Sequence, residues 1–271
     1  MSKPQLKLAA ITQSRVPVGF QEFEGDRQFA TTLARGLELL RCFTPREPVL
    51  GNKELAQRLK LPTTTISRLT YTLMRMGYLA QSEGYGKYHL GSAVLSLGYP
   101  LLELFTMRSH ARPLMLELAE ETGGSISIGI RDRFNIVYIE AIRVGTLRLH
   151  PLDVGATHSL AGTAMGRAVL MSSLPKEREA LLHQLRVKAP EEWERHGAEL
   201  TRNLTQYANS GCCVSVGEIF PDIQAVAVPL GRIDRGEPAA LNCAFQGRPL
   251  NETWLRETIA PRLLALARRI A

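Results

Sequence analysis

The 271-residue sequence is poor in cysteine and has no long hydrophobic run. It contains four cysteines: Cys42, Cys212, Cys213 and Cys243. They include no CxxC pair, and a bridge between adjacent cysteines is strained, so we expect buried free thiols in a reducing compartment. The longest apolar runs, such as Ile223–Leu230, are too short to cross a bilayer. No apolar stretch follows the two lysines of Met1–Ala10, so we expect no signal peptide and a cytoplasmic protein.

Common catalytic motifs are also missing. The sequence has no GxSxG elbow, no GxxxxGK(S/T) phosphate loop and no HExxH zinc motif. Gly162–Gly166 lacks the spacing of a dinucleotide site, and Asp153, His158 and Ser159 match no activated-nucleophile pattern. His150 and His158 flank Asp153, but no histidine has ligand spacing on one helix face, which favours ordinary polar positions over a metal site. We therefore expect no catalytic residue, no cofactor and no metal.

What the sequence does have is an ordinary globular composition, with 45% hydrophobic and 22% charged residues, and enough chain for two domains. Its net charge of +7 is unevenly divided. Residues 1–90 hold 13 Lys and Arg against 7 Asp and Glu, whereas residues 91–271 hold 20 against 19. A basic segment joined to a nearly neutral body predicts a polyanion-binding module attached to a second domain. Basic surfaces also serve solubility alone.

The basic segment predicts three helices. Residues 1–26 have no sustained periodicity and are expected to form a mobile arm, and apolar residues at helical spacing predict a first helix over Phe29–Phe43. A second helix starts near Asn52, and Lys60–Pro62 breaks the chain before a third. The third helix has an apolar face that we expect to point inward: Ile66, Leu69, Leu73 and Met76. Its other face carries Thr64, Ser67, Arg68 and Tyr71, with Thr65 and Arg75 beside them.

This outward face suits the major groove of DNA. Small side chains permit close approach, hydroxyls reach phosphates or bases, and an arginine can donate twice to guanine. The alternative is a solvated amphipathic helix in a bundle. The next segment favours DNA binding, because Tyr78–Gln81, Ser82–Lys87 and Tyr88–Leu90 predict strand, glycine-rich turn and strand. Such a hairpin is the wing of a winged helix-turn-helix, and Lys87 near its tip is placed to contact phosphates.

The remaining two-thirds predict a leucine-rich connector and then an α+β domain. Ser92–Gly123 is expected to be helical with a break near Pro113, and its leucines suit a dimer surface. The alternation of apolar residues predicts strands at Ile126–Ile130 and Val137–Ile139. Further elements are expected as follows: helices over Gly162–Ser173, Lys176–Leu185 and Glu191–Asn209, strands near Ile223–Leu230 and Ala239–Gly247, and a helix over Asn251–Ile270.

One segment of this domain has the chemistry of a ligand site. At Gly162 and Thr163 an extended segment enters a helix, which leaves backbone N–H groups at a positive helix end, a favourable place for a carboxylate. Capping of the helix by Thr163 explains the same residues without a ligand. Arg148 and His150 alternate on the preceding strand, where either can face a ligand carboxylate or solvent.

These segments resemble the IclR family of transcriptional regulators. The resemblance covers roughly residues 27–270 and is carried by these motifs: Leu55-Ala56, Leu61–Leu69, Leu73, Gly77-Tyr78, Tyr88–Gly91, Ala111–Pro113 and Leu160–Arg167. Lys60 stands where many members carry Gly, which costs little if the backbone is not strongly left-handed there. Gly25-Asp26 and Phe29–Leu37 resemble the branch that controls aromatic-acid catabolism.

The resemblance implies an α+β fold in which a winged helix-turn-helix domain (27–91) follows a flexible arm (1–26). A linker helix (92–110) then leads to a GAF-like α/β effector-binding domain (111–271). DNA contacts are expected from Thr63, Thr64, Thr65, Ser67, Arg68, Tyr71 and Lys87. An effector pocket is expected from Leu160, Ala161, Gly162, Thr163, Ala164, Ser215, Ala225, Asn242, Ala244 and Arg148. This pocket wall is less polar than in members that bind very small oxo-acids, which indicates a larger ligand.

The implied function is sequence-specific regulation of transcription, modulated by a small organic acid, with an aromatic acid as one candidate. The expected partners are a double-stranded operator with an inverted repeat and further copies of the chain in a dimer or tetramer. Two other classes stay open at this point. One is a ligand sensor whose basic head docks a protein partner, and the other is an enzyme with an appended basic domain.

Overall fold

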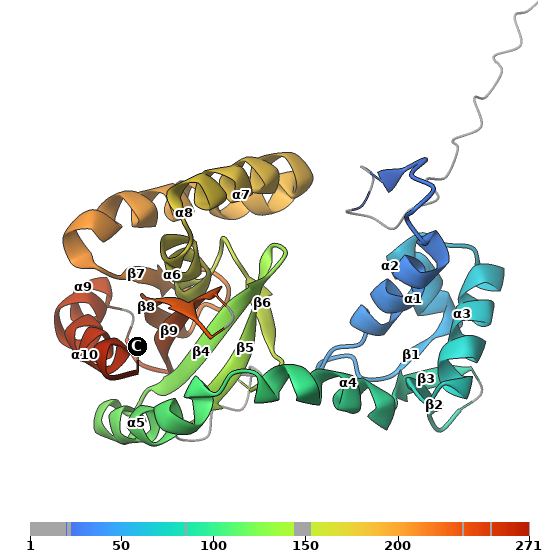
Figure 1. Cartoon of the computed structure of the whole chain (residues 1–271), viewed down its shortest axis with the longest axis horizontal. Helices are drawn as coiled ribbons and strands as arrows, with labels where there is room; N and C mark the ends of the chain where they lie inside the picture. The colour runs from blue at the N-terminus through green and yellow to red at the C-terminus, as the bar shows by residue number, and fades with distance from the viewer. Residues whose placement is uncertain are drawn as a thin grey trace, which may run out of the picture. The chain divides into compact units, whose positions relative to one another are not determined.

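The computed structural model describes residues 20, 23–84, 86–143, 153–234, 236–249 and 251–270. The chain forms two compact units, Met1–Tyr99 and Pro100–Ala271, and each is considered by itself (Figure 1). Most of the predicted arm lies outside the described residues, as do Arg148 and His150. Within the described ranges, no helix combines the length and the apolar character that a membrane span requires.

The first unit packs helices against a small antiparallel sheet. Its elements are α1 (Thr31–Arg41), β1 (Leu50–Gly51), α2 (Asn52–Leu59), α3 (Thr63–Arg75), β2 (Leu79–Gln81) and β3 (Lys87–Leu90). The strands lie in the order β1-β3-β2. One core joins the helices to the sheet and contains Leu39, Phe43, Leu50, Leu55, Ile66, Leu69 and Leu79. The predicted order of helix, turn, helix and hairpin is confirmed. The structure adds the strand β1, which the sequence does not predict because a two-residue strand has no periodic pattern.

The turn between α2 and α3 differs from expectation at Lys60. Its backbone is left-handed, with φ 53° and ψ 40°, and its N–H donates to the Ala56 carbonyl to end α2. A residue with a Cβ is strained in this region, so lysine costs about 1 kcal/mol here relative to glycine. Lysine would cost little only in a backbone that is not left-handed, and the backbone at Lys60 is left-handed.

The inward face of α3 is confirmed for Ile66 and Leu69, which are buried, while Leu73 is half-buried. The prediction for Met76 is wrong, because this side chain is 58% exposed. α3 ends at Arg75, and the chain turns away one residue beyond Met76. Thr70 is buried instead, with its hydroxyl donating to the Ile66 carbonyl at 3.0 Å.

Two helices lie between β3 of the first unit and the first strand of the second unit in the sequence: α4 (Ser92–Glu103) and α5 (Met107–Thr122). The boundary between the units falls inside α4, at Tyr99 and Pro100. The predicted break at Pro113 is wrong, since α5 continues through it. Burial of Ala111, Met115 and Leu118 compensates for the hydrogen bond that a proline cannot donate. The helices separate instead at residues 104–106.

The second unit is built on a six-stranded antiparallel sheet in the order β6-β5-β4-β9-β8-β7. The strands are β4 (Ser125–Asp132), β5 (Asn135–Ile142), β6 (Thr157–Ser159), β7 (Cys213–Val216), β8 (Ile223–Ile233) and β9 (Glu237–Gln246). Pairing of β4 with β5 shifts between Ile128 and Gly129, which oppose Glu140 and Tyr138 and leave Ile139 as a bulge. The bulge directs Tyr138 and Glu140 to opposite faces of the sheet.

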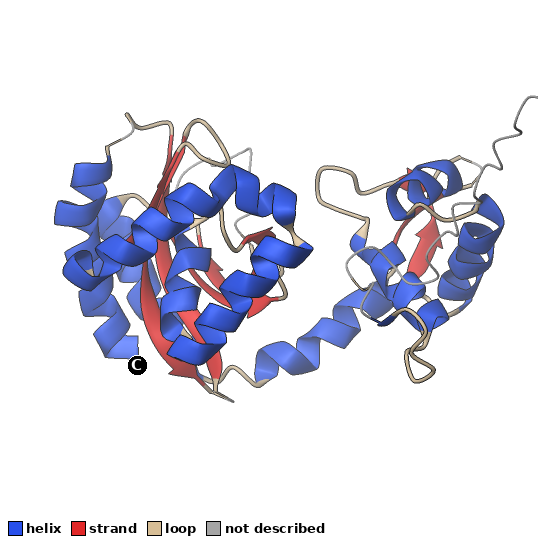
Figure 2. Ribbon diagram, turned by 90° about the horizontal axis from the view of Figure 1, so that it is seen from above, coloured by secondary structure: helices blue, strands red, loops and turns tan. Residues whose placement is uncertain are grey.

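Helices cover both faces of this sheet (Figure 2). One face packs against α6 (Ala164–Ser172), α7 (Pro175–Lys188) and α8 (Pro190–Ser210). The other packs against α5 and the C-terminal helices, which are α9 (Glu252–Trp254), the π-helical turn η2 (Leu255–Ile259) and α10 (Ala260–Ile270). The α6 face of the sheet carries small residues, among them Ser127, Gly129, Ala225 and Ala244. Cys212, Cys213 and Cys243 are buried free thiols, and Cys42 is half-buried.

Candidate functional site

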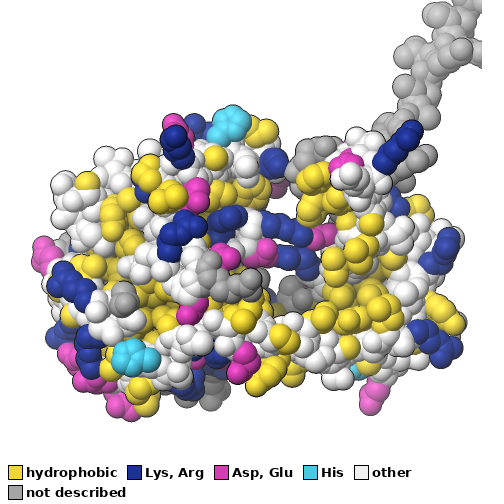
Figure 3. All heavy atoms as spheres, in the orientation of Figure 1, with side chains coloured by type: hydrophobic (Ala, Val, Ile, Leu, Met, Phe, Trp, Pro, Cys, Tyr) yellow, Lys and Arg dark blue, Asp and Glu magenta, His cyan; other side chains and the backbone are white. Residues whose placement is uncertain are grey.

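The exposed face of α3 is the first candidate site. Thr63, Thr64, Ser67, Arg68 and Tyr71 are exposed, and Thr65 is half-buried. We call these six residues the reading face. The Arg75 guanidinium lies 5.2 Å from the centre of the Tyr71 ring, which places a second cation beside this face. Lys and Arg side chains also appear along the margin of this unit over α3 (Figure 3).

Asn52 links the start of α2 to the reading face. Its amide nitrogen donates to Ser67 Oγ at 3.2 Å, and its amide oxygen, 3.3 Å from Thr70 Oγ1, is an alternative acceptor to the Ile66 carbonyl for that hydroxyl. These contacts fix the start of α2 relative to α3. Helical periodicity could not identify Asn52, because its partner lies fifteen residues along the chain.

Lys87 lies in β3, opposite Gly51, and pairs with Glu54 of α2. Its ammonium donates to the Glu54 carboxylate, and this hydrogen bond holds the pKa of Glu54 below its ordinary value. Both side chains are partly exposed, so the pair is worth little to stability. The structure therefore places Lys87 beside the turn of the wing, on the tip side of the hairpin, with its charge shared with Glu54.

The start of α6 is the second candidate site. Thr163 caps the helix, since its Oγ1 accepts from the Gly166 amide at 3.1 Å and donates to the Ser159 carbonyl at 2.7 Å. The Gly162 amide donates to Ser159 Oγ at 2.9 Å, and that hydroxyl donates to Glu192 at 2.8 Å. The capping interpretation is therefore correct for these amides.

Part of this helix end remains available for a ligand. Within the part of the chain that the structure describes, the amides of Thr163, Ala164 and Met165 have no acceptor. They belong to the first turn of α6, where the helix dipole is positive. Leu160, Ala161, Gly162 and Ala164 are buried around this turn.

Two residues of α6 hold the turn in place. A Cβ at Gly166 would lie 2.1 Å from the Leu160 carbonyl oxygen, so only glycine allows this close approach. Arg167 is fully buried. Its guanidinium donates to the Ala161 carbonyl at 2.9 Å, to the Val214 carbonyl at 2.7 Å and to both carboxylate oxygens of Glu218, at 2.8 and 2.5 Å. Arg167 thus joins the turn to β7 and to the loop after it.

A narrow pocket of about 50 Å³ opens beside this turn. It is lined by Tyr138, His158, Thr163, Ser215, Ile219, Phe220, Ile223 and Ala244. The rings of Tyr138 and His158 are 5.2 Å apart. A volume of this size has room for about two water molecules.

The structure brings most of the predicted pocket residues together. Thr163, Ser215 and Ala244 line the pocket directly. Ala225 lies between the last two, opposite Ser215 on one side and Ala244 on the other. Ser215 Oγ donates to the Gly162 carbonyl at 3.3 Å, which ties β7 to the α6 turn. Arg148 lies outside the described residues.

Asn242 lies deeper, on the same face of β9 as Ala244, and Tyr138 is hydrogen-bonded to it. Burial raises the pKa of Tyr138 to about 12, so its phenol is protonated. The other lining residues, among them Tyr138, His158 and Phe220, come from separate strands and loops, and no local pattern in the sequence marks them.

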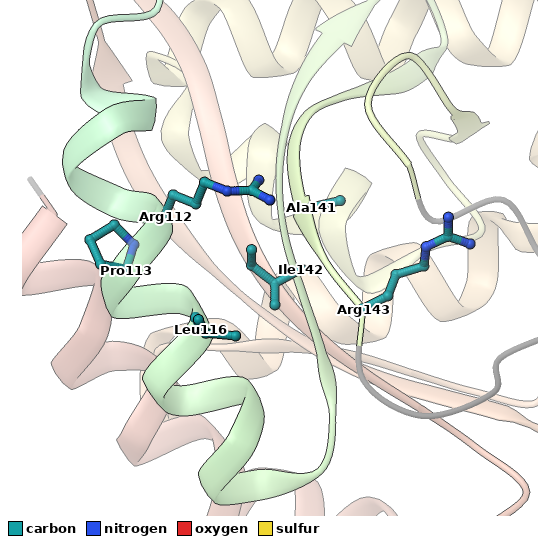
Figure 4. A pocket seen from close by; sticks show the side chains of 6 residues that line it. All are labelled: Arg112, Pro113, Leu116, Ala141, Ile142 and Arg143. Atoms are coloured by element: carbon teal, nitrogen blue, oxygen red, sulfur yellow. The ribbon is translucent and has the colours of Figure 1, made fainter.

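A second pocket, of about 400 Å³, lies between α5 and the end of β5. Arg112, Pro113 and Leu116 line it from the helix, while Ala141, Ile142 and Arg143 line it from the strand (Figure 4). Its arginines already have partners, because Arg112 pairs at 2.5 Å with the buried Glu140 and Arg143 pairs with Asp153.

Glu140 anchors α5 to β5. Its carboxylate is buried and pairs with Arg112 and, at 3.2 Å, with Arg108. Both arginines lie in the first two turns of α5. Across the described residues, no three His, Cys, Asp or Glu side chains converge as a metal site would require.

A winged helix-turn-helix with an uncovered polar helix face, joined to an α/β domain, is the architecture of a DNA-binding transcriptional regulator. Comparison with known proteins agrees. The family model for the IclR helix-turn-helix domain matches residues 32–83, and that for the C-terminal domain of bacterial transcriptional regulator IclR matches residues 101–271. The chain belongs to the IclR family, and the predicted fold class is confirmed.

Relatives of known function or structure match along most of the chain. HTH-type transcriptional regulator TsaQ1/TsaQ2 of Comamonas testosteroni is 31% identical, covering 88% of this chain and 86% of the relative. The Pca regulon regulatory protein of Pseudomonas putida is 28% identical, covering 92% and 85%. The crystal structure of an IclR family transcriptional regulator from Brucella abortus is 40% identical with a TM-score of 0.78, covering 90% and 92%. These relatives are regulators, and none supports a protein-docking head or an enzyme.

Proposed function

We propose that the chain regulates transcription by binding an operator through the reading face and a small carboxylate through the α6 turn. The observation that carries the DNA contact is the uncovered polar face of α3, held by Asn52 next to the wing. Arg68 and the hydroxyls of Thr63, Thr64, Thr65 and Ser67 contact base edges and phosphates, with Tyr71 beside them. Lys87 contributes to phosphate binding only in part, because Glu54 shares its charge.

The effector side of the proposal rests on the first turn of α6. A carboxylate accepts from the amides of Thr163, Ala164 and Met165, in the positive field of the helix end. The predicted residues Leu160, Ala161, Gly162, Ala225, Asn242 and Ala244 form the surrounding wall with Ser215. The aromatic and aliphatic lining supports an aromatic acid, in line with the resemblance to the aromatic-acid branch.

An aromatic ring is larger than the pocket, so its entry requires the loop over residues 217–222 to move. Ile219 and Phe220 of this loop line the pocket, and Glu218 of the same loop binds Arg167. Movement of this loop therefore acts on the α6 turn as well. A coupling of about 1–3 kcal/mol between effector and operator binding is typical of such regulators.

The proposal includes a homo-oligomer, a dimer or tetramer, that binds an inverted repeat. α4 exposes large apolar side chains: Leu95, Leu97, Tyr99 and Leu101. Hydrophobic side chains are visible on the surface over this helix (Figure 3). We assign DNA binding to residues 27–91 after an arm of residues 1–26, a linker helix to 92–110 and effector binding to 111–271.

The test is selection of bound fragments from a random duplex library with the full chain at near-physiological salt. Enrichment of an inverted repeat is expected, and the selected duplex then reports the effect of added carboxylic acids. Enrichment of no sequence, from folded protein with and without acids, would contradict DNA reading. An unchanged affinity with every acid that binds the protein would contradict the regulatory role alone.

A further inference from the structure

Among the residues that the structure describes, three buried side-chain oxygens on the α6 face of the sheet have no hydrogen-bond partner: Ser125 Oγ, Ser127 Oγ and Asn242 Oδ1. The residues are 1%, 1% and 4% exposed. Buried polar atoms are nearly always paired in folded proteins, because an unpaired one loses its hydration without compensation. A cluster of them is a place where another molecule, either an ordered water or a ligand, can supply the partners.

The cluster lies on the face of the sheet that the pocket occupies. Ser127 is directly opposite Asn242, and Ser125 is directly opposite Ala244. Opposite residues of an antiparallel pair share a face, and Ala244 lines the pocket. Tyr138 lines the pocket as well and is hydrogen-bonded to Asn242. We call Ser125, Ser127, Tyr138 and Asn242 the pocket floor.

We propose that the pocket floor recognises a second polar group of the effector, remote from its carboxylate, and so selects hydroxylated acids. This inference rests on the proposed function, since the carboxylate must first be held at the α6 turn. It assigns a specificity role to Ser125, Ser127 and Tyr138, which the sequence did not single out, and a defined role to Asn242.

A hydroxyl is the group that matches the floor. The Asn242 oxygen only accepts, whereas the serine hydroxyls and the Tyr138 phenol both donate and accept. A ligand hydroxyl donates to Asn242 and accepts from a neighbour, and it fits either orientation of the Asn242 amide. A second carboxylate does not fit, because it cannot donate to Asn242, and the described lining holds no lysine or arginine.

The first measurement is the affinity of the full chain for benzoate and for 2-, 3- and 4-hydroxybenzoate by titration calorimetry. We expect at least one hydroxybenzoate to bind about tenfold or more tightly than benzoate, the size that one buried hydrogen bond produces. In Asn242→Ala and in Ser127→Ala, this ratio is expected to fall to near one. Ser173→Ala is the matched control, since Ser173 is buried with its hydroxyl bonded to the Val169 carbonyl, away from the pocket lining.

The second measurement is thermal unfolding without ligand. Ser127→Ala removes an unpaired buried hydroxyl and is expected to leave the midpoint unchanged or raise it, whereas Ser173→Ala is expected to lower it. A lower midpoint for Ser127→Ala would show that a structural water already satisfies the floor, and it would overturn the proposal.

The affinities distinguish a failure of the pocket-floor inference from a failure of the proposed effector site. If benzoate binds as tightly as every hydroxybenzoate, or if the preference survives in Asn242→Ala, the pocket floor does not select the ligand and the effector site itself stands. If none of the four acids binds, the aromatic-acid proposal and the pocket-floor inference both fall.

Discussion

The reading face of α3 and the pocket floor are built from similar side chains, with hydroxyls prominent in both, but they differ in burial. Groups on the reading face are mostly exposed and remain hydrated until DNA replaces the water. Groups on the floor are buried, and three of their oxygens have no partner among the described residues. The first site therefore costs the fold little, whereas unpaired buried groups at the second destabilise it, a cost that the effector we propose would remove. DNA binding should be separable from stability, and effector binding should not.

The largest expected effect is that of Gly166→Ala. The added methyl would meet the Leu160 carbonyl at 2.1 Å, and a backbone atom cannot move aside cheaply. We expect the second unit to lose about 4 kcal/mol or more of unfolding free energy. Denaturation followed by tryptophan fluorescence measures this unit alone, because the chain's two tryptophans, Trp193 and Trp254, both belong to it.

Gly98→Ala is the control for this substitution, and because Gly98 belongs to the first unit, unfolding of both variants is also followed by circular dichroism. Gly98 lies in α4, and a Cβ there would meet nothing within 4 Å. Alanine is favoured over glycine inside a helix by roughly 0.5–1 kcal/mol. If Gly166→Ala were as well tolerated as Gly98→Ala, the α6 turn would not be the closely packed site described above.

Arg167→Met should come next, with a loss of about 3 kcal/mol from the second unit. Methionine retains the length of the side chain but leaves Glu218 and two carbonyls without their donor. A double variant with Glu218→Gln is expected to recover part of the loss, because the unpaired charge is gone. Equal stability of Arg167→Met and the wild type in urea would show that this ion pair does not hold the turn.

Arg68→Ala is expected to lower operator affinity by about 1–3 kcal/mol without changing unfolding. Fluorescence anisotropy with the selected duplex gives the first quantity, and circular dichroism during heating gives the second. Arg268→Ala, an exposed arginine of α10, serves as the control. A parallel loss of stability and affinity in Arg68→Ala would break the distinction between the two sites.

The smallest effect is a gain. Lys60→Gly relieves the left-handed backbone at the α2–α3 turn and should stabilise the first unit by about 1 kcal/mol. Amide hydrogen exchange of α2 and α3 is the appropriate measurement, since this unit has no tryptophan. Slower exchange is expected in both helices, and faster exchange would mean that the lysine side chain contributes more than its backbone strain removes.

The difference between the two sites also explains what the sequence could predict. The reading face lies within one helix, so polar residues spaced three and four apart in the sequence predict it. The pocket draws Tyr138, His158 and Phe220 from segments up to 82 positions apart, and no local period connects them. The position of Lys87 beside the wing turn follows from the sequence, but its pairing with Glu54, 33 residues away, is visible only in three dimensions.

The predictions that are wrong have local causes. Pro113 predicts a helix break by its own chemistry, but the burial of its neighbours on α5 outweighs one missing hydrogen bond. Met76 continues the apolar spacing of α3 beyond the point at which the helix ends. The sequence marks Arg167 only as part of the Leu160–Arg167 motif, because a buried arginine cannot be distinguished from an exposed one until its acceptors are known.

The bulge at Ile139 has a mechanical consequence. Two residues apart on β5, Tyr138 faces the pocket while Glu140 binds Arg108 and Arg112 on the opposite side of the sheet. In a regular strand these side chains would share a face, and the sheet would separate the pocket from α5. Here one short segment of β5 has side chains on both faces of the sheet. A displacement of Tyr138 can therefore reach α5 through the backbone of Ile139 and Glu140.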